Sequence, residues 1–237
     1  MSWKKKIDKY FTCLERLSVL DKHGTEIRPE TAFQKWMSQT HRIATSKKTV
    51  FFIGNGASAS MSSHFAADLA KNASIHTRTF YDLSEMTAIA NDICFEEVFA
   101  EPLRLWMEPG DMLIAISSSG QSHNVLRAVE TALEIGGYVV SLSAMRPENR
   151  LRSMGVLNFY VPAQTYGVAE TCHAAVLHHW TDMVAARAKC ERSRSTVRNA
   201  IGKPLDPEFD LWDGQEIPKA GPLLVEDMLA GRNRSDR

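Results

Sequence analysis

The sequence carries no net charge, few cysteines and no long hydrophobic run. Its 28 Lys and Arg residues balance 28 Asp and Glu residues over 237 positions, so no overall field attracts it to nucleic acid or to an anionic membrane. Its apolar runs are short, so no segment is expected to span a bilayer. The N-terminal MSWKKKIDKYF lacks the apolar stretch and cleavage site of a signal peptide. Four cysteines stand apart without a CxxC pair, which predicts reduced thiols in a cytoplasmic protein.

The chain does contain two alternating kinds of hydrophobic pattern. Short apolar runs predict strands at 49–53, 77–81, 111–116, 138–142 and 156–161. Amphipathic patterns predict helices at 3–20, 29–44, 58–72, 84–92, 95–106, 125–135 and 167–189. This alternation indicates an α/β protein with a parallel sheet covered on both faces.

The polar composition after residue 190 predicts a boundary in the chain. We expect residues 1–190 to form a single domain, including a helical N-terminal part over 1–46. Residues 191–237 are expected to be a polar extension with one weak apolar cluster at Phe209, Leu211 and Trp212.

Two loops that follow predicted strands are rich in small polar residues. The first, GNGASAS at 54–60, begins like a dinucleotide-binding fingerprint, but Ala59 stands where the third glycine belongs, and it lacks the GK[ST] of a P-loop. The second, SSSGQS at 117–122, offers four hydroxyls and free backbone N–H groups at a helix N-terminus, which suit a phosphate. A single serine is explained as a helix cap. Four within six residues favour a phosphate site.

Ionisable side chains are concentrated on two of the predicted helices. His64 and Asp68 lie four residues apart and so face one side, as metal ligands or an acid–base pair would, although alone the pair is more typical of a structural contact. The segment AETCHAAVLHHW adds one carboxylate and three imidazoles, namely Glu170, His173, His178 and His179.

Spacing leaves open which of these groups act together. Glu170 and His173 have the Glu-x-x-His spacing of di-iron bundles, but the sequence has no second such motif. Glu170 and His178 lie eight apart, about 12 Å along an ideal helix, and could share a metal only if it lay between them.

Several motifs together resemble one family. FIGNGASAS, HFAADLAKN, TAIANDICFEEVFA, ISSSGQS and HAAVLH stand in the order found in sedoheptulose 7-phosphate isomerases (phosphoheptose isomerases) of the sugar-isomerase, or SIS, superfamily. The resemblance covers roughly 48–185. It implies a three-layer α-β-α fold with a flavodoxin-like parallel sheet and two N-terminal helices. It also implies a homotetramer with active sites between subunits and one Zn²⁺ per subunit.

The resemblance also implies roles for particular residues. Zinc would be surrounded by His64, Asp68, Glu170 and His178, with Asp68 and His178 catalytic. The sugar phosphate would be bound by Asp68 and Glu170 and by Asn55, Gly56, Ala57, Ser58, Asn91, Asp92, Ser117, Ser118, Ser119 and Ser122. The implied reaction converts sedoheptulose 7-phosphate to a D-glycero-D-manno-heptose 7-phosphate through an enediol(ate).

The sequence departs from the family pattern at several of these positions. Asp68 replaces a Glu, Glu170 replaces a Gln, Ala57 replaces a Gly and Asn72 replaces an Arg. Oxygen ligands are preserved at Asp68 and Glu170, so metal binding could survive. The departures leave two alternatives open: an isomerase of a different phosphosugar, or a non-catalytic SIS-domain protein that binds a phosphosugar for regulation.

Overall fold

Seven strands form one sheet in the computed structural model, which describes residues 2–201. The strands are β1 (Ser18–Asp21), β2 (Glu26–Ile27), β3 (Thr49–Gly54), β4 (His76–Thr79), β5 (Met112–Ser117), β6 (Tyr138–Ala144) and β7 (Leu157–Val161). The helices are α1 (Trp3–Glu15), α2 (Pro29–Thr45), α3 (Ala57–Ala73), α4 (Leu83–Asp92), α5 (Ala100–Trp106), α6 (His123–Ile135) and α7 (Tyr166–Ile201), with 3₁₀ turns η1 (Phe95–Glu97) and η2 (Arg150–Ser153). Residues up to Ser195 form one compact unit.

The sheet has the order β2-β1-β7-β6-β5-β3-β4. Strands β3 to β7 are parallel to one another, and in chain order they follow the 2-1-3-4-5 arrangement of flavodoxin-like folds. All six residues of β5 are buried, as expected for the central strand of a parallel sheet covered on both faces. The predicted fold class is therefore confirmed.

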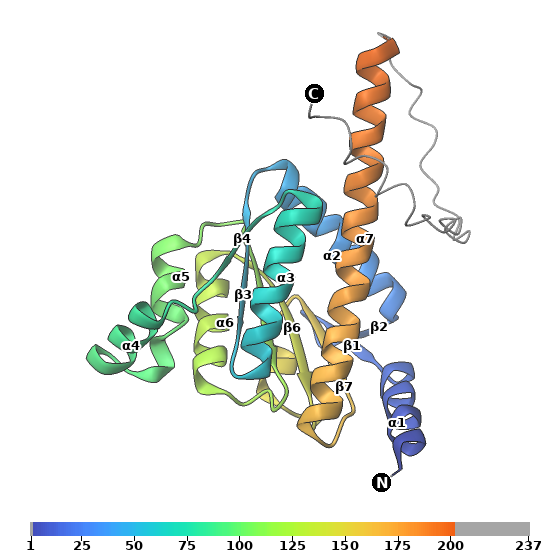
Figure 1. Ribbon diagram of the computed structural model, residues 1–237. Coiled ribbons are helices and arrows are strands. Elements are labelled where there is room, and N and C mark those ends of the chain that lie inside the picture. The colour runs from blue at the N-terminus through green and yellow to red at the C-terminus, as the bar shows by residue number, and fades with distance from the viewer. Residues whose placement is uncertain (1, 202–237) are drawn as a thin grey trace, which may run out of the picture. The chain divides into compact units, whose positions relative to one another are not determined.

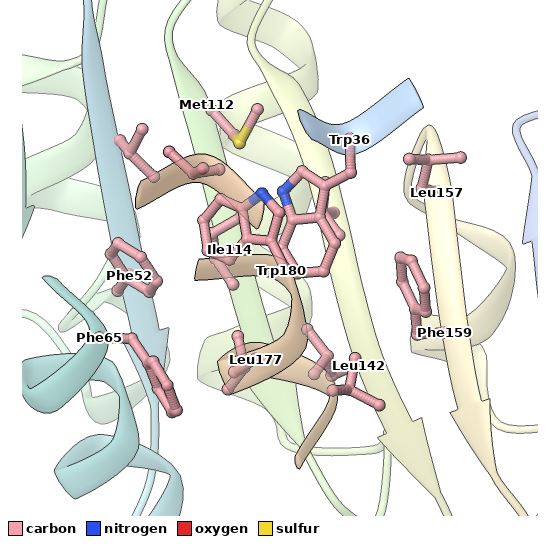
Figure 2. Close-up of a cluster of buried hydrophobic side chains, with 14 of the residues drawn as sticks. Trp36, Phe52, Phe65, Met112, Ile114, Leu142, Leu157, Phe159, Leu177 and Trp180 are labelled. Carbon is pink, nitrogen blue, oxygen red and sulfur yellow. The ribbon is translucent and has the colours of Figure 1, made fainter. Parts of the chain in front are cut away.

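Helices cover both faces of this sheet (Figure 1). On one face α2, α3 and α7 pack through an aromatic core in which the rings of Trp36 and Trp180 stack at 4.1 Å between centroids (Figure 2). On the other face lie α5 and α6. Successive side chains of β3 point to opposite faces of the sheet. Phe52 packs beside Trp180 in the core under α2, α3 and α7, whereas Phe51 contacts Phe80 in the core under α5 and α6.

The N-terminal segment differs from the prediction. The helix expected over 3–20 ends at Glu15, and the following residues form the hairpin β1–β2. Strand β1 pairs antiparallel with the edge of β7, with Val19 opposite Phe159. The pairing satisfies backbone groups of β7 that a longer helix would leave open, and Gly24 (φ 74°) supplies the turn.

Two further element boundaries differ from expectation. The helix predicted over 95–106 is divided into η1 and α5, and Pro102 lies in the first turn of α5, where its missing N–H costs no helical hydrogen bond. Helix α7 continues past 189 to Ile201. From residue 202 onward the expected polar extension lies outside the described residues. Over residues 2–201, no helix has both the length and the apolar character needed to cross a membrane. All four cysteines are free thiols, as expected.

Candidate functional site

A cavity of about 390 Å³ opens where β3 and β5 end side by side. From β3 the chain crosses to β4 on one side, and from β5 it crosses to β6 on the other. Such a reversal separates the loops at the carboxyl ends of the strands and is where ligands bind in open α/β sheets. The cavity is lined by Asn55, Gly56, Ala57, Ser58, Ile116, Ser117, Ser118, Ser119, Ser122, Tyr166 and Glu170.

The loop after β3 is shaped by two glycines. A Cβ on Gly54 would lie 2.6 Å from the Ser58 Cβ and 2.8 Å from the Ile116 carbonyl oxygen, so glycine lets α3 start directly against β5. Gly56 has φ 57° and precedes the first residue of α3. Because this conformation costs glycine little, the loop turns sharply and directs the N-terminus of α3 toward the cavity.

An amide pair joins the two loops. The Asn55 side chain donates to Asn124 Oδ1 and accepts from Asn124 Nδ2, each at 2.9 Å. Asn124 is buried in the first turn of α6, so the pair fixes the position of the first loop relative to the second.

The serine loop leaves one hydroxyl without a partner. The Ser117 and Ser122 hydroxyls lie 3.2 Å apart, and Ser119 Oγ accepts from the Gln121 N–H at 3.2 Å. Ser118 Oγ is buried and has no hydrogen-bond partner among the described residues. A buried hydroxyl without a partner is costly, so Ser118 is a group that a bound ligand could satisfy.

The charge of the cavity comes from backbone dipoles and one carboxylate. The N-termini of α3 and α6 both lie at its wall, and their free N–H groups favour an anion. Glu170 is the one charged side chain among the lining residues, which include no Lys, Arg or His. An anionic phosphate would therefore be bound by N–H and O–H donors.

Three predicted ligands meet on the helices beside this cavity. His64 and Asp68 of α3 and His178 of α7 each offer a ligand atom, and these atoms lie within 4.8 Å of one another. His64 Nε2 lies 3.3 Å from Asp68 Oδ2, and the rings of His64 and His178 are 5.5 Å apart between centroids. Two imidazoles and one carboxylate are a donor set that suits Zn²⁺ and leaves a coordination position open. The residues present therefore fit such a metal.

The other predicted site residues fall in two places. Every expected residue of the two loops lines the cavity: Asn55, Gly56, Ala57, Ser58, Ser117, Ser118, Ser119 and Ser122. Glu170 lines it too and is not a member of the His64–Asp68–His178 group. Asn91 and Asp92, in contrast, lie exposed at the end of α4, where Asn91 Nδ2 donates to Asp92 Oδ1 at 2.8 Å, and they do not line the cavity.

Sequence reasoning missed two lining residues, the apolar Ile116 at the end of β5 and the polar Tyr166. Tyr166 is the one that could contact a ligand through a polar group. Its side chain is 61% exposed and lies at the start of α7, four residues before Glu170. Residues four apart share a face of a helix, so this spacing was the available signal.

The remaining histidines of α7 have structural surroundings. His173 is fully buried with Nε2 3.0 Å from the Ser143 carbonyl oxygen. Burial lowers its pKa to about 4, so the imidazole is neutral at physiological pH. The His179 ring meets Phe33 edge-on, with 4.6 Å between centroids.

Comparisons with known proteins agree on a family. The model of the SIS domain matches residues 30–144. The phosphoheptose isomerase of Shewanella sediminis is 30% identical over 169 residues, which cover 68% of this chain and 85% of that protein. The one from Syntrophotalea carbinolica is 32% identical over 141 residues, covering 57% and 71%.

Solved structures show the same fold. Phosphoheptose isomerase from Neisseria gonorrhoeae matches 77% of this chain and 99% of its own, with a TM-score of 0.62 at 23% identity. The NanR protein of Vibrio vulnificus, complexed with ManNAc-6P, matches 83% of this chain and 67% of its own, with a TM-score of 0.53 at 15% identity. Taken with the sequence relatives, these findings establish that the chain belongs to the phosphoheptose isomerase family of SIS-domain proteins.

Proposed function

We propose that the protein is a phosphosugar isomerase that converts a ketose phosphate into an aldose phosphate. The observation that carries this proposal is the cavity at the β3/β5 reversal, which is lined by the serine-rich loop, together with the His-Asp-His cluster on α3 and α7, two helices that also contribute residues to the cavity wall. Relatives named phosphoheptose isomerase make sedoheptulose 7-phosphate the substrate to test first, with a D-glycero-D-manno-heptose 7-phosphate as product.

The serine loop would hold the phosphate. Ser118 supplies a free buried hydroxyl, and Ser119 and Ser122 stand beside the N-terminus of α6. Binding the phosphate there fixes one end of the sugar and so places the carbonyl end against the remaining groups of the site.

The His-Asp-His cluster would hold the metal and serve the carbonyl end. The side chains of three predicted ligands, His64, Asp68 and His178, lie close enough together to share a metal, whereas Glu170 is not a member of that group. A bound Zn²⁺ would polarise the carbonyl and hydroxyl oxygens of the substrate. We assign proton transfer at this end to Asp68 and His178, since isomerisation through an enediol moves protons on both carbon and oxygen.

We also propose that copies of the chain assemble as a homotetramer. Helix α1 exposes Trp3, Ile7 and Phe11, four residues apart on one face, to 73%, 47% and 63%. A stripe of this kind on a helix marks an interaction surface. The resemblance implies active sites between subunits, and the exposed position of Asn91 and Asp92 on α4 would allow them to complete a neighbour's site.

The decisive experiment is turnover of sedoheptulose 7-phosphate followed by NMR in D2O, with metal-stripped and zinc-reloaded protein in parallel. We expect a heptose 7-phosphate only in the zinc-reloaded sample, with deuterium incorporated next to the carbonyl. Turnover that is independent of zinc would contradict the metal assignment.

A second candidate function is phosphosugar binding without catalysis. Glu170 favours this second function, because a carboxylate at a position where the resemblance implies an amide changes the charge of the binding surface. Saturable binding of the sugar phosphate without product or deuterium exchange would identify this function.

A further inference from the structure

We propose that Glu170 is the general base that removes the proton from the substrate carbon next to the carbonyl. The proposal rests on the isomerase function above and adds a catalytic group to it. It gives the carbon-bound proton to Glu170 and leaves the oxygen-bound protons to the His64–Asp68–His178 cluster.

The first observation is the shortage of titratable groups in the cavity. Apart from Glu170, the only lining side chain that can exchange a proton is the phenol of Tyr166; the others are serines, small or apolar residues and one asparagine. A sugar bound by its phosphate to the serine loop lies in this cavity, so a base acting directly on its carbons has to come from the wall. At neutral pH, a carboxylate is a far better proton acceptor than a phenol.

The second observation is that the Glu170 carboxylate is uncommitted. It is partly buried, yet among residues 2–193, whose side chains the structure describes, it has no hydrogen-bond or ion-pair partner. Asp68, in contrast, lies 3.3 Å from His64 Nε2 and 3.6 Å from Lys71 Nζ. The Asp68 carboxylate therefore has charged or ionisable neighbours that compete for its lone pairs, whereas Glu170 has none among the described side chains.

The third observation is the rigidity of its support. Three residues close to Glu170 on α7, Ala169, Cys172 and His173, are fully buried against the body of the domain. The helix therefore holds the carboxylate at a fixed place on the cavity wall, and a base positioned in this way requires little rearrangement to act.

The proton transfer balances without any further reactant. Glu170 accepts the proton from the hydroxyl-bearing carbon next to the carbonyl, and the electrons of that C–H bond form the C=C bond of the enediol. The carbonyl π electrons move to oxygen, which takes up a proton. The protonated Glu170 then returns its proton to the former carbonyl carbon, and the neighbouring hydroxyl loses its proton as the new carbonyl forms. Glu170 is a carboxylate both before the first proton transfer and after the last one.

The test replaces Glu170 with its neutral isostere. Glu170→Gln also restores the residue that the resemblance implies here, so a role in shape or metal binding alone would leave activity intact or raise it. We expect kcat to fall by roughly 10²- to 10⁴-fold, the usual contribution of a general base, with deuterium exchange falling by the same factor. KM and zinc content should stay within about threefold of wild type, because neither depends on the base.

Two matched variants complete the design. Glu170→Asp keeps the carboxylate one methylene shorter and should retain part of the activity that Gln loses. Glu134→Gln removes a carboxylate from the exposed side of α6, away from the cavity, and should behave as wild type.

Each outcome has a definite meaning. A Glu170→Gln protein with wild-type turnover overturns this role but leaves the isomerase function standing. A Glu170→Gln protein that loses its zinc also overturns it, since the lost activity would then follow from the lost metal. A wild-type protein that binds sugar phosphate with neither turnover nor exchange overturns the isomerase function and this role together.

Discussion

Ser118 has the least satisfied side chain in the serine loop. Its neighbours Ser117, Ser119 and Ser122 each have a hydrogen-bond contact within the loop, whereas the Ser118 hydroxyl is buried without one in the described chain. Leaving a buried hydroxyl unpaired costs about 1–3 kcal/mol. Because this unpaired hydroxyl lies at the cavity wall, a bound ligand that accepts its hydrogen bond would remove the cost.

Substituting this residue should weaken substrate binding without harming the fold. We expect Ser118→Ala to raise the KM for the sugar phosphate about tenfold, since a hydrogen bond to a charged oxygen is worth about 1.5–3 kcal/mol. The melting temperature should be unchanged or higher, because the variant removes an unpaired polar group. Steady-state kinetics and thermal melting measure the two effects.

Ser141 provides the control for this variant. It is equally buried, but its hydroxyl donates to Asn158 Oδ1 at 2.7 Å inside the sheet. Ser141→Ala should therefore lower the melting temperature and leave KM unchanged. Should Ser118→Ala instead destabilise the protein with no effect on KM, the hydroxyl has a structural role only.

At the scale of elements, helix α7 connects the core to the site. It carries Glu170 at the cavity, His178 in the cluster and Trp180 in the aromatic core. Its attachment to the sheet includes the contact between His173 and the carbonyl oxygen of Ser143 in β6. The position of both functional groups therefore depends on how well this helix stays packed.

The packing of α7 against the sheet at His173 should weaken in acid. The pKa of His173 is lowered by burial to about 4, below the 6.5 of a free histidine. Between these values the unfolded chain binds a proton that the folded chain excludes, so the free energy of unfolding rises with pH and falls as pH drops from 6.5 toward 4. The loss attributable to His173 approaches about 3 kcal/mol at pH 4.

Urea unfolding between pH 4.5 and 7.5 measures the effect. His173→Gln, which has no titrating group, should show a flatter pH dependence than wild type, and His179→Gln on the exposed side of α7 should follow wild type. Identical pH slopes for wild type and His173→Gln would show that His173 is not responsible.

The sequence predicted the parallel strands and their helices better than it predicted the antiparallel strands β1 and β2 at one edge of the sheet. The buried runs of β3, β5, β6 and β7 are apolar enough to be recognised directly, because both their faces are covered. Strand β1 was missed since Leu17 and Leu20 continue the helical spacing of α1, and only Val19 of that strand is fully buried. Its identity as a strand comes from pairing with β7, a contact over about 140 residues that no local pattern contains.

The site shows the same division between local and long-range information. The polar loops and the His64–Asp68 pair were visible as local motifs. His178 was predicted beside that pair only from the family resemblance, and the structure brings the three side chains together. Which group Glu170 joins depends on the packing of α7 against α3 and the loops, so helical spacing left it open. Asn91 and Asp92 lie on a helix with no buried residue, and the fold of one chain does not bring them to the cavity.

At the scale of the whole molecule, α1 has an uncovered apolar face. The exposed stripe of Trp3, Ile7 and Phe11 lies beside the side of the helix from which Tyr10, Cys13 and Leu14 pack against the core. The proposed tetramer would bury it.

Charging this stripe should reduce the size of the assembly. We expect Phe11→Glu to give a particle of lower mass in light scattering after size exclusion, because a carboxylate in an apolar interface loses its hydration without a partner. Lys5→Glu changes charge on another side of α1 and should keep the mass of wild type. A wild-type protein that is already monomeric would rule out the assembly.

Because Glu170 and His178 stand on one continuous helix, the site has little tolerance for insertions and deletions between them. Adding or removing a single residue there would turn one group about 100° around the helix axis relative to the other and shift it by about 1.5 Å. Between positions 170 and 178 the site can therefore change only through substitutions that keep the length of the helix. The carboxylate at 170, where the resemblance implies an amide, is a change of that kind.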